Sequence, residues 1–476
     1  MNAPTNQQNP AGAAGNAVSA EALAQAESYI EAEEGAANKL RGALAVLITV
    51  LAIGMSVFHL YTAYAIVPTQ TLRPLHVSMV LVLTFLMFPV AARYRHRIML
   101  WDWLAAILSI AIVWYLIQGG DDFTDRNTMP EAWDIFFGIA LIALILEAMR
   151  RTNGWVMPVV TLAFIAYALV GPWLPAPWTH KGYEVGRLIG VLYMTLEGIY
   201  GAAVDVSSSL IILFTIFGAF LQYSGAGKFY IDFSFAAMGG KPTGAGRTVV
   251  LASFLLGGPS GSGVATTVTL GAVAYPMLAK VGYEKNAAGG LLSAGGLGAI
   301  ISPPVLGAAA FVIAEFLKTS YLDVLLMAII PTGLFYLALF LMVEIDARKY
   351  AMGRSSFEAA DTLWNLTRKY WFHFLSLISI VVFMMMGFSP VMSVFWATIV
   401  SGLTSLLRSD TTLLPYNLLG KGDGTPWIQR FWNSGFIKAM ENGSTGVLNV
   451  GATCAGAGII VRSEEHTSEL QSRETI

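Results

Sequence analysis

Long apolar segments separated by short polar loops dominate the chain between residues 43 and 461. Most of them approach the roughly 20 residues that an α-helix needs to cross a bilayer, and they contain few charges. The pattern predicts membrane spans at Ala43–Val67, Val77–Ala92, Met99–Gln118, Trp133–Met149, Trp155–Leu174, Ser207–Leu221, Val324–Val343, Tyr370–Met386 and Val391–Leu407.

Two further apolar runs are too long for one straight span, and each contains residues that break helices. The run 248–279 includes the glycine- and serine-rich segment Gly257–Gly263, and the run 286–314 includes Ser302-Pro303-Pro304. At about 1.5 Å per residue, a continuous helix over either run would exceed a hydrocarbon core of about 30 Å. We therefore expect a re-entrant hairpin at 248–279 and a broken helix at 286–314.

Basic residues in the loops predict the orientation, because cytoplasmic loops carry an excess of Lys and Arg. Lys39 and Arg41 precede the first span, which places the N-terminus in the cytoplasm. Arg247 and Lys285 flank the run 248–279, so both of its ends are expected on the cytoplasmic side. The tip of the hairpin must then lie inside the protein, since unpaired backbone is not tolerated against lipid.

Composition excludes a soluble enzyme as the default interpretation. Charged residues make up only 12% of the 476 residues and hydrophobic residues 55%, whereas a soluble domain carries about 25% charged residues. The formal net charge of −2 gives no support to nucleic-acid binding. A single cysteine, Cys454, excludes an internal disulfide framework and a cysteine-cluster metal site. We expect an all-α, polytopic membrane protein.

The two ends of the chain differ from its apolar middle. Residues 1–42 are polar, lack the features of a cleavable signal peptide and are interpreted as a cytoplasmic tail. Polarity changes abruptly after Val461, and residues 462–476 resemble the translation of a sequencing-library adapter. We interpret 462–476 as a non-native tail, so that the natural protein would continue beyond Val461 and this chain would be a fragment.

A short motif occurs twice. Residues 197–209 (EGIYGAAVDVSSS) resemble residues 441–453 (ENGSTGVLNVGAT), and each copy opens an apolar run. We call them the first and second copies of the opening motif. The first copy is predicted outside and the second inside, which is the signature of an inverted-topology repeat with its substrate site at broken helices near the membrane midplane.

Two segments resemble a known transporter family. Residues 254–283 (FLLGGPSGSGVATTVTLGAVAYPMLAKVGY) closely resemble the hairpin of the TRAP transporter large permease, and residues 302–316 (SPPVLGAAAFVIAEF) match its second signature. TRAP transporters are tripartite, ATP-independent and dependent on a periplasmic binding protein. The resemblance covers about residues 186–461, with Ala265-Thr266 where the family commonly has Ala-Asn.

Residues 40–174 resemble the small membrane subunit, fused in front as in permeases that work with TAXI-type binding proteins. The resemblance therefore implies a small-subunit-like bundle at 43–174, the first repeat of the large permease at 175–408, and the start of the second repeat at 409–461. It also implies Na⁺-driven uptake of a small organic anion, a carboxylate or dicarboxylate, across the bacterial inner membrane. No enzymatic activity, no nucleic-acid partner and no cofactor other than Na⁺ as coupling ion is expected. Because the second repeat would be incomplete, the 476-residue chain is not expected to transport alone.

The expected binding residues gather at the two helix breaks. Na⁺, like other hard cations, prefers about five or six oxygen ligands, which a membrane protein supplies from hydroxyls and from carbonyls freed where a helix breaks. Glycine allows close backbone approach, and proline leaves carbonyls of the preceding turn without a donor. The predicted cation- and substrate-binding residues are Gly258, Ser260, Gly261, Ser262, Gly263, Thr266, Thr267, Ser302, Pro303 and Pro304.

Two other functions remain open at this point. An ABC-type importer permease would also span the membrane, with its ATPase on a separate chain. An intramembrane serine protease would use the turn at Gly258–Gly261, but it needs a histidine base within hydrogen-bond reach, for which His373 is the candidate.

Other polar residues in the apolar segments are given smaller roles. His59, His76 and His373, on different spans, are interpreted as structural. Asp205 is expected to cap the span that begins at Ser207.

The hairpin interpretation predicts the accessibility of its two flanking loops. Single cysteines next to Arg247 and next to Lys285, in a Cys454→Ser background, should both be protected from a membrane-impermeant thiol reagent in intact cells. Labelling of one site but not of the other would replace the hairpin with a simple crossing.

Overall fold

The computed structural model describes residues 37–38, 40–176, 178–238, 243–260, 263–349, 361–415 and 426–474, without the side chains of residues 92, 258–260, 265 and 463–474. All regular elements in these ranges are helical, which confirms the predicted all-α fold. Eight of the described helices are long and apolar enough to cross a membrane, or nine if one bent pair is counted as a span.

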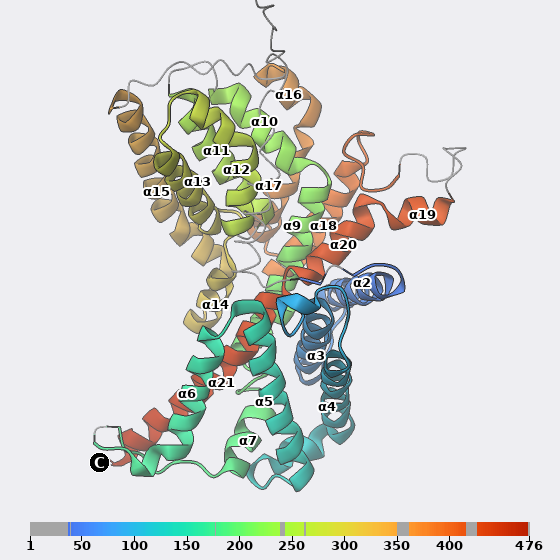
Figure 1. Ribbon diagram of the computed structural model, residues 1–476, viewed down its shortest axis with the longest axis vertical. Helices are drawn as coiled ribbons and strands as arrows, with labels where there is room; N and C mark the ends of the chain where they lie inside the picture. The colour runs from blue at the N-terminus through green and yellow to red at the C-terminus, as the bar shows by residue number, and fades with distance from the viewer. Residues whose placement is uncertain are drawn as a thin grey trace, which may run out of the picture.

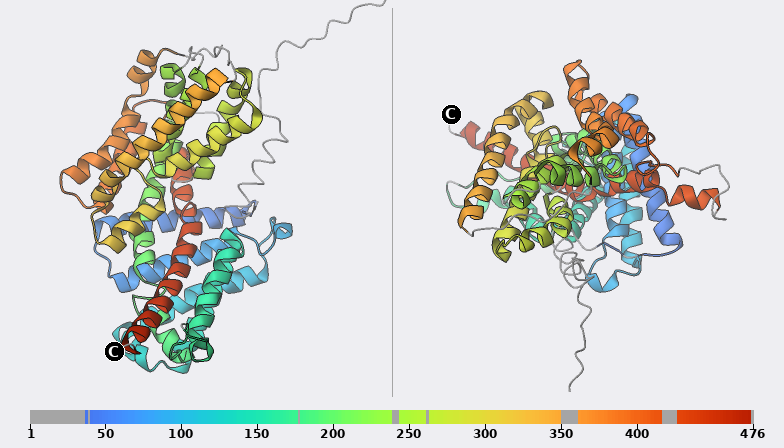
Figure 2. Two further views of the ribbon diagram at one scale, coloured as in Figure 1. Left: turned by 90° about the vertical axis from the view of Figure 1, so that its left-hand side faces the viewer. Right: turned by 90° about the horizontal axis from the view of Figure 1, so that it is seen from above.

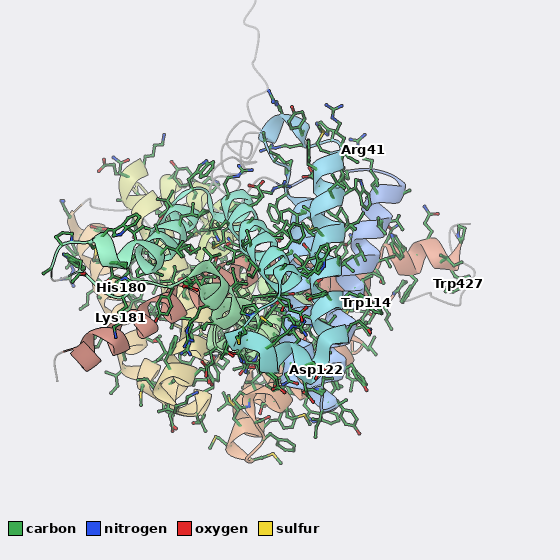
Figure 3. The ribbon with its side chains drawn as sticks, turned by 90° about the horizontal axis from the view of Figure 1, so that it is seen from below. Arg41, Trp114, Asp122, His180, Lys181 and Trp427 are labelled. Carbon is green, nitrogen blue, oxygen red and sulfur yellow. The ribbon has the colours of Figure 1, made fainter. Side chains whose placement is uncertain are left out.

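The N-terminal part consists of five helices that correspond to the first five predicted spans. They are α2 (Ala43–Tyr64), α3 (Thr69–Met87), α4 (Leu100–Asp125), α5 (Ala132–Asn153) and α6 (Val156–Val170), with the 3-10 turns η1 (Ala92–Tyr94), η2 (Arg126–Thr128) and η3 (Gly171–Trp173). Figure 3 shows the molecule from below and labels Asp122 of α4 and, further to the left, His180 and Lys181, which follow α6.

A central span follows the short amphipathic helix α7 (Val185–Tyr193). It consists of α8 (Ala202–Val206), the π-helical turn η4 (Ser207–Ile211) and α9 (Ile212–Tyr223). In the most apolar stretch of this span 78% of the residues are buried inside the protein, against 22% in the span of α6. The central span therefore lies at the centre of the fold.

The start of this central span corrects one prediction. The helix begins at Ala202, so Asp205 lies inside it and does not cap a helix that starts at Ser207. Asp205 instead forms an ion pair with Arg73 of α3, with 3.0 Å between Nη2 and Oδ1. The ion pair neutralises the carboxylate, which allows the helix to start before the apolar run.

The hairpin region occupies the upper left of Figure 1. Its helices are α10 (Ala226–Met238), α11 (Gly244–Ser260), α12 (Gly263–Lys280), α13 (Lys285–Ile300), α14 (Ala308–Leu317) and α15 (Tyr321–Lys349). The helices α11, α12 and α13 pack against one another, as a hairpin followed by the first half of a broken helix requires. Together with α10 and α15 they enclose a hydrophobic core that is separate from the larger core of the molecule.

At the base of the hairpin, the first turn of α11 contacts α15 and the loop between α12 and α13. Arg247 of α11 donates to Glu344 of α15, with 2.6 Å between Nε and Oε1. Tyr283, between α12 and α13, is buried with its hydroxyl against Gly246, and burial raises the pKa of Tyr283 to about 12. Both ends of the run 248–279 therefore lie at the same end of the structure, as the loop charges predict.

The C-terminal part completes the fold. Its helices are α16 (Leu363–Tyr370), α17 (Phe372–Met385), α18 (Pro390–Ser405), α19 (Trp427–Trp432), α20 (Gly435–Thr445) and α21 (Leu448–Glu474). The predicted span Tyr370–Met386 corresponds to α17, and the chain bends by 62° between α16 and α17, at the start of this span.

The last helix, α21, packs against helices of the N-terminal part. Helix α21 begins inside the second copy of the opening motif and runs beside α5 and α6 (Figure 2). It continues without a break past Val461. Residues of α2–α6 consequently share one hydrophobic core with α7–α9, α20 and α21.

Glycines allow the tip of the hairpin to approach the end of α13 closely. A Cβ at Gly257 would lie 2.8 Å from the Cα of Ala299, and a Cβ at Gly263 would lie 2.9 Å from the carbonyl oxygen of Gly296. A Cβ at Gly296 would meet the Thr267 hydroxyl and the Gly263 carbonyl. The tip therefore packs backbone against backbone on the last turns before the break.

This contact predicts that Gly296→Ala destabilises the protein. The added methyl group should separate α12 from α13 and cost about 1–3 kcal/mol, as overpacking of a close contact does. Gly290→Ala is the matched control, because Gly290 lies on the same helix with nothing within 4 Å of an added Cβ. SDS titration in mixed micelles measures both changes. Equal midpoints for the two variants would contradict the close contact.

Candidate functional site

The structure brings the predicted hairpin residues and the predicted break together. Gly258 and Ser260 lie in the last turns of α11, and Gly263 opens α12. Gly261 and Ser262 lie outside the described residues, as does the side chain of Ser260. Because the tip packs on α13 just before the break, the two breaks form one polar region inside an apolar bundle.

Thr267, after the tip, faces this region. Thr267 donates its hydroxyl to the carbonyl of Gly263 at 2.8 Å and lies 3.5 Å from the carbonyl of Leu292 on α13. Since its proton is directed to a carbonyl, the lone pairs of the Thr267 oxygen remain suited to a cation. Thr266 is 1% exposed, so its side chain also points into the protein.

The break after α13 leaves carbonyls without helical partners, and α15 supplies hydroxyls there. Thr332 donates to the carbonyl of Ile301 at 2.6 Å. Ser302 is fully buried, donates to the carbonyl of Gly298 at 2.7 Å and lies 3.0 Å from the hydroxyl of Tyr336. These contacts hold the broken segment against α15.

The second half of the break is held in the same way. Pro303 and Pro304 are joined by a cis peptide bond. The backbone N–H of Leu306 donates to the hydroxyl of Tyr321 at 3.2 Å, and that hydroxyl lies 3.4 Å from the carbonyl of Pro304. The chain then resumes a helix at Ala308.

Sequence reasoning missed the three hydroxyl residues of α15, although a signal was present. Tyr321, Thr332 and Tyr336 are spaced by 11 and 4 residues, which places them on one face of a helix with 3.6 residues per turn. Polar groups on one face of an otherwise apolar helix indicate a polar partner. The apolar length of a segment predicts a span but does not indicate which of its faces contacts polar groups.

Other polar residues of the apolar segments lie away from this region. Glu315 forms an ion pair with Lys318, whose side chain is 76% exposed. His373, the base that a protease would need, packs among aromatic rings, with its ring centroid 4.5 Å from that of Phe372. His59 and His76, expected to be scattered on different spans, are hydrogen-bonded to each other at 2.9 Å.

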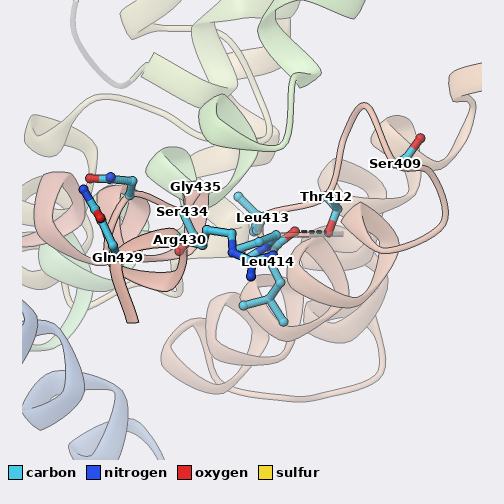
Figure 4. A pocket seen from close by; sticks show the side chains of 10 residues that line it. Ser409, Thr412, Leu413, Leu414, Gln429, Arg430, Ser434 and Gly435 are labelled. Carbon is cyan, nitrogen blue, oxygen red and sulfur yellow. Dashed lines mark hydrogen bonds between the residues drawn. The ribbon is translucent and has the colours of Figure 1, made fainter. Parts of the chain in front are cut away.

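A separate hollow of about 450 Å³ lies between the segment 409–415 and the helices α19 and α20 (Figure 4). It is lined by polar residues that include Arg430 and Ser434. The predicted binding residues are absent from its described lining. The candidate site therefore rests on the hairpin tip and the break.

Comparison with known protein families relates this chain to a family of transporter components. The chain matches the family model described as the DctM component of tripartite ATP-independent periplasmic transporters over residues 140–462. The match begins inside α5 and includes the hairpin, the break and both copies of the opening motif. It covers more than half of the chain.

Curated relatives carry corresponding names. A 2,3-diketo-L-gulonate TRAP transporter large permease of Escherichia coli is 34% identical over 109 residues, 23% of this chain and 26% of that protein. A C4-dicarboxylate TRAP transporter large permease of Pseudomonas aeruginosa is 31% identical over 162 residues, 32% of this chain and 37% of that protein. One of Rhodobacter capsulatus is 35% identical over 94 residues, 20% of this chain and 21% of that protein.

The matched segments span between about a fifth and two fifths of the length of these relatives. The family match is far longer and includes the polar region at the two helix breaks. The chain belongs to the DctM family of tripartite ATP-independent periplasmic transporter components.

Proposed function

We propose that this chain is the membrane permease of a TRAP transporter that takes up a small organic anion, a carboxylate or dicarboxylate. A Na⁺ gradient drives uptake, and a TAXI-type periplasmic binding protein delivers the solute. The observation that carries the proposal is the packing of a glycine-rich hairpin tip on a broken helix. Family membership supports transport, and relatives named for 2,3-diketo-L-gulonate and for C4-dicarboxylates support an organic anion.

The chemistry of the two breaks suits both a cation and an anion. Hydroxyl oxygens of Thr267 and Ser302 lie near backbone carbonyls, and Na⁺ prefers such oxygen ligands. The helices α12 and α14 both begin at these breaks. Helix N-termini carry partial positive charge, so they favour a carboxylate of the substrate.

Part of the hairpin region has a hydrophobic core of its own, formed by α10–α13 and the second half of α15. The helix α14 and the first turns of α15 belong to the core that contains the central span. Alternating access would move the first part relative to the second.

The N-terminal helices support a fused small subunit. Residues 43–139 precede the part of the chain that matches the DctM family, yet they pack on it through a shared core. We propose that residues 43–174 act as this subunit, in the bacterial inner membrane with the N-terminus in the cytoplasm. The domain boundaries at 174, 408 and 461 and the adapter origin of residues 462–476 stay predictions.

The competing functions differ in the energy source that drives uptake and in the residues that their sites require. The matched family is described as ATP-independent, which favours a secondary transporter over an ABC-type importer permease. Uptake that survives ATP depletion while the Na⁺ gradient is held would support the proposal, and uptake that follows ATP would support the ABC alternative. The protease alternative gains no support from His373, which packs among aromatic rings.

The proposal predicts Na⁺-dependent uptake in proteoliposomes with the partner binding protein. The reading frame is amplified from the genome across the Val461 codon, so that the tested protein carries whatever follows. Changing Ser260→Ala and Ser262→Ala together should raise the Na⁺ concentration needed for half-maximal uptake by about tenfold, the effect of about 1.4 kcal/mol of lost ligation.

Thr269→Val is the matched control for this experiment. Thr269 lies on α12 two residues after Thr267, but its side chain is exposed, so its hydroxyl should not affect Na⁺ activation. Unchanged Na⁺ dependence in the double variant would refute the cation site. Uptake without any Na⁺ dependence in the unaltered protein would refute Na⁺ coupling.

A further inference from the structure

Two buried histidines of the N-terminal helices meet at the start of the central span. His59 of α2 and His76 of α3 are both fully buried, with 2.9 Å between His59 Nε2 and His76 Nδ1. His59 Nδ1 lies 2.8 Å from the carbonyl oxygen of Met55. His76 Nε2 lies 2.9 Å from the hydroxyl of Ser207, the first residue of the π-helical turn.

The chemistry of these groups fixes the direction of every hydrogen bond. A carbonyl only accepts, so His59 donates from Nδ1 to Met55, and its Nε2 accepts when the ring is neutral. His76 must then donate from Nδ1, and its Nε2 accepts the proton of Ser207. An unpaired imidazolium would be costly in this apolar setting, and the carboxylate of Asp205 is already in an ion pair. Both rings are therefore neutral Nδ1–H tautomers.

Helix α3 holds the first copy of the opening motif. Arg73 donates from Nε to Asp205 at 3.0 Å and from Nη1 to the carbonyl of Tyr200 at 2.9 Å. One turn further along α3, His76 binds Ser207. Three residues of the first copy are thus bound by two side chains of α3.

Helix α2 holds the second copy through hydroxyl groups. Thr49 donates to Glu441 at 2.9 Å. Ser444 donates to the carbonyl of Ala52 at 2.7 Å, and the hydroxyls of Ser56 and Ser444 are 2.5 Å apart. The bond between the two histidines therefore lies between a helix that binds one copy and a helix that binds the other.

The two copies also meet His76 at equivalent positions. When they are aligned residue for residue, Ser207 of the first copy corresponds to Gly451 of the second. A Cβ at Gly451 would lie 3.6 Å from His76 Nε2 and 2.9 Å from Cγ2 of Val80. One copy thus supplies the hydroxyl that binds His76, and the other packs closely on Val80 of α3, within van der Waals distance of the His76 ring.

We propose that His59 and His76 are positioning residues that fix the two copies of the opening motif relative to each other during transport. This role rests on the transport function proposed above. The link adds a chain of hydrogen bonds to the direct packing of α21 on α3, α8 and the π-helical turn. Without it, the π-helical turn loses its hydrogen-bonded connection through His76 and His59 to α2, the helix that binds the second copy.

Nitrogen-15 NMR of histidine-labelled protein in micelles tests the link without requiring transport. Spectra of His59→Phe and His76→Phe assign two of the six histidines. Both should be neutral Nδ1–H tautomers that do not titrate between about pH 5 and 8, with a coupling across the N–H···N bond. Nε2–H tautomers, or titration near the ordinary histidine value of about 6.5, would overturn the proposal.

Uptake kinetics test the positioning role. Each single change, His59→Phe or His76→Phe, should lower the maximal uptake rate about fivefold without changing the half-saturating solute concentration. The double variant should be no slower than either single one, because both break the same link. Thr84→Val is the matched control: Thr84 of α3 is fully buried, and its hydroxyl has no hydrogen-bond partner among the described residues.

The outcomes separate this inference from the function on which it rests. Absence of uptake by the unaltered protein with its binding protein would overturn the proposed function. Uptake by the unaltered protein at a rate that all three histidine variants reproduce would overturn the positioning role. Losses that add in the double variant would show two independent structural contributions and would also overturn it.

Discussion

A backbone carbonyl that loses its helical partner inside a bilayer must find another donor, because no water is present to take that place. This constraint governs the break after α13. Thr332 of α15 donates to the carbonyl of Ile301, and Ser302 turns back to the carbonyl of Gly298 within reach of Tyr336. The break is stable because of α15, so α15 belongs to the candidate site as much as the broken segment does.

The same constraint explains why glycine is concentrated where the hairpin tip meets α13. A polar tip can be buried only if its backbone comes close to other polar backbone, and side chains would prevent this approach. Gly257 lies against Ala299, and Gly263 lies against Gly296. Close packing thereby gathers carbonyls and hydroxyls in one dry region, which is the environment that an ion or a carboxylate needs to be bound in place of its hydration shell.

The apolar pattern located the spans, the hairpin and the break, because bilayer thickness sets the length of each apolar segment. It did not reveal which helix faces pair. The predicted span Val324–Val343 contains Thr332 and Tyr336 but begins after Tyr321, and only the spacing of the three residues marks their shared face. The apolar run alone predicts that the helix starts at Ser207 with Asp205 as its cap, whereas the pairing of Asp205 with Arg73 depends on contact between distant segments.

Hydrogen–deuterium exchange of the purified protein with Na⁺, compared with K⁺ at equal ionic strength, tests most directly whether tip and break form one binding site. The account predicts that Na⁺ slows the exchange of amides in residues 257–267 and in residues 296–307 together. Slower exchange in only one of these segments, or no difference between Na⁺ and K⁺, would contradict it.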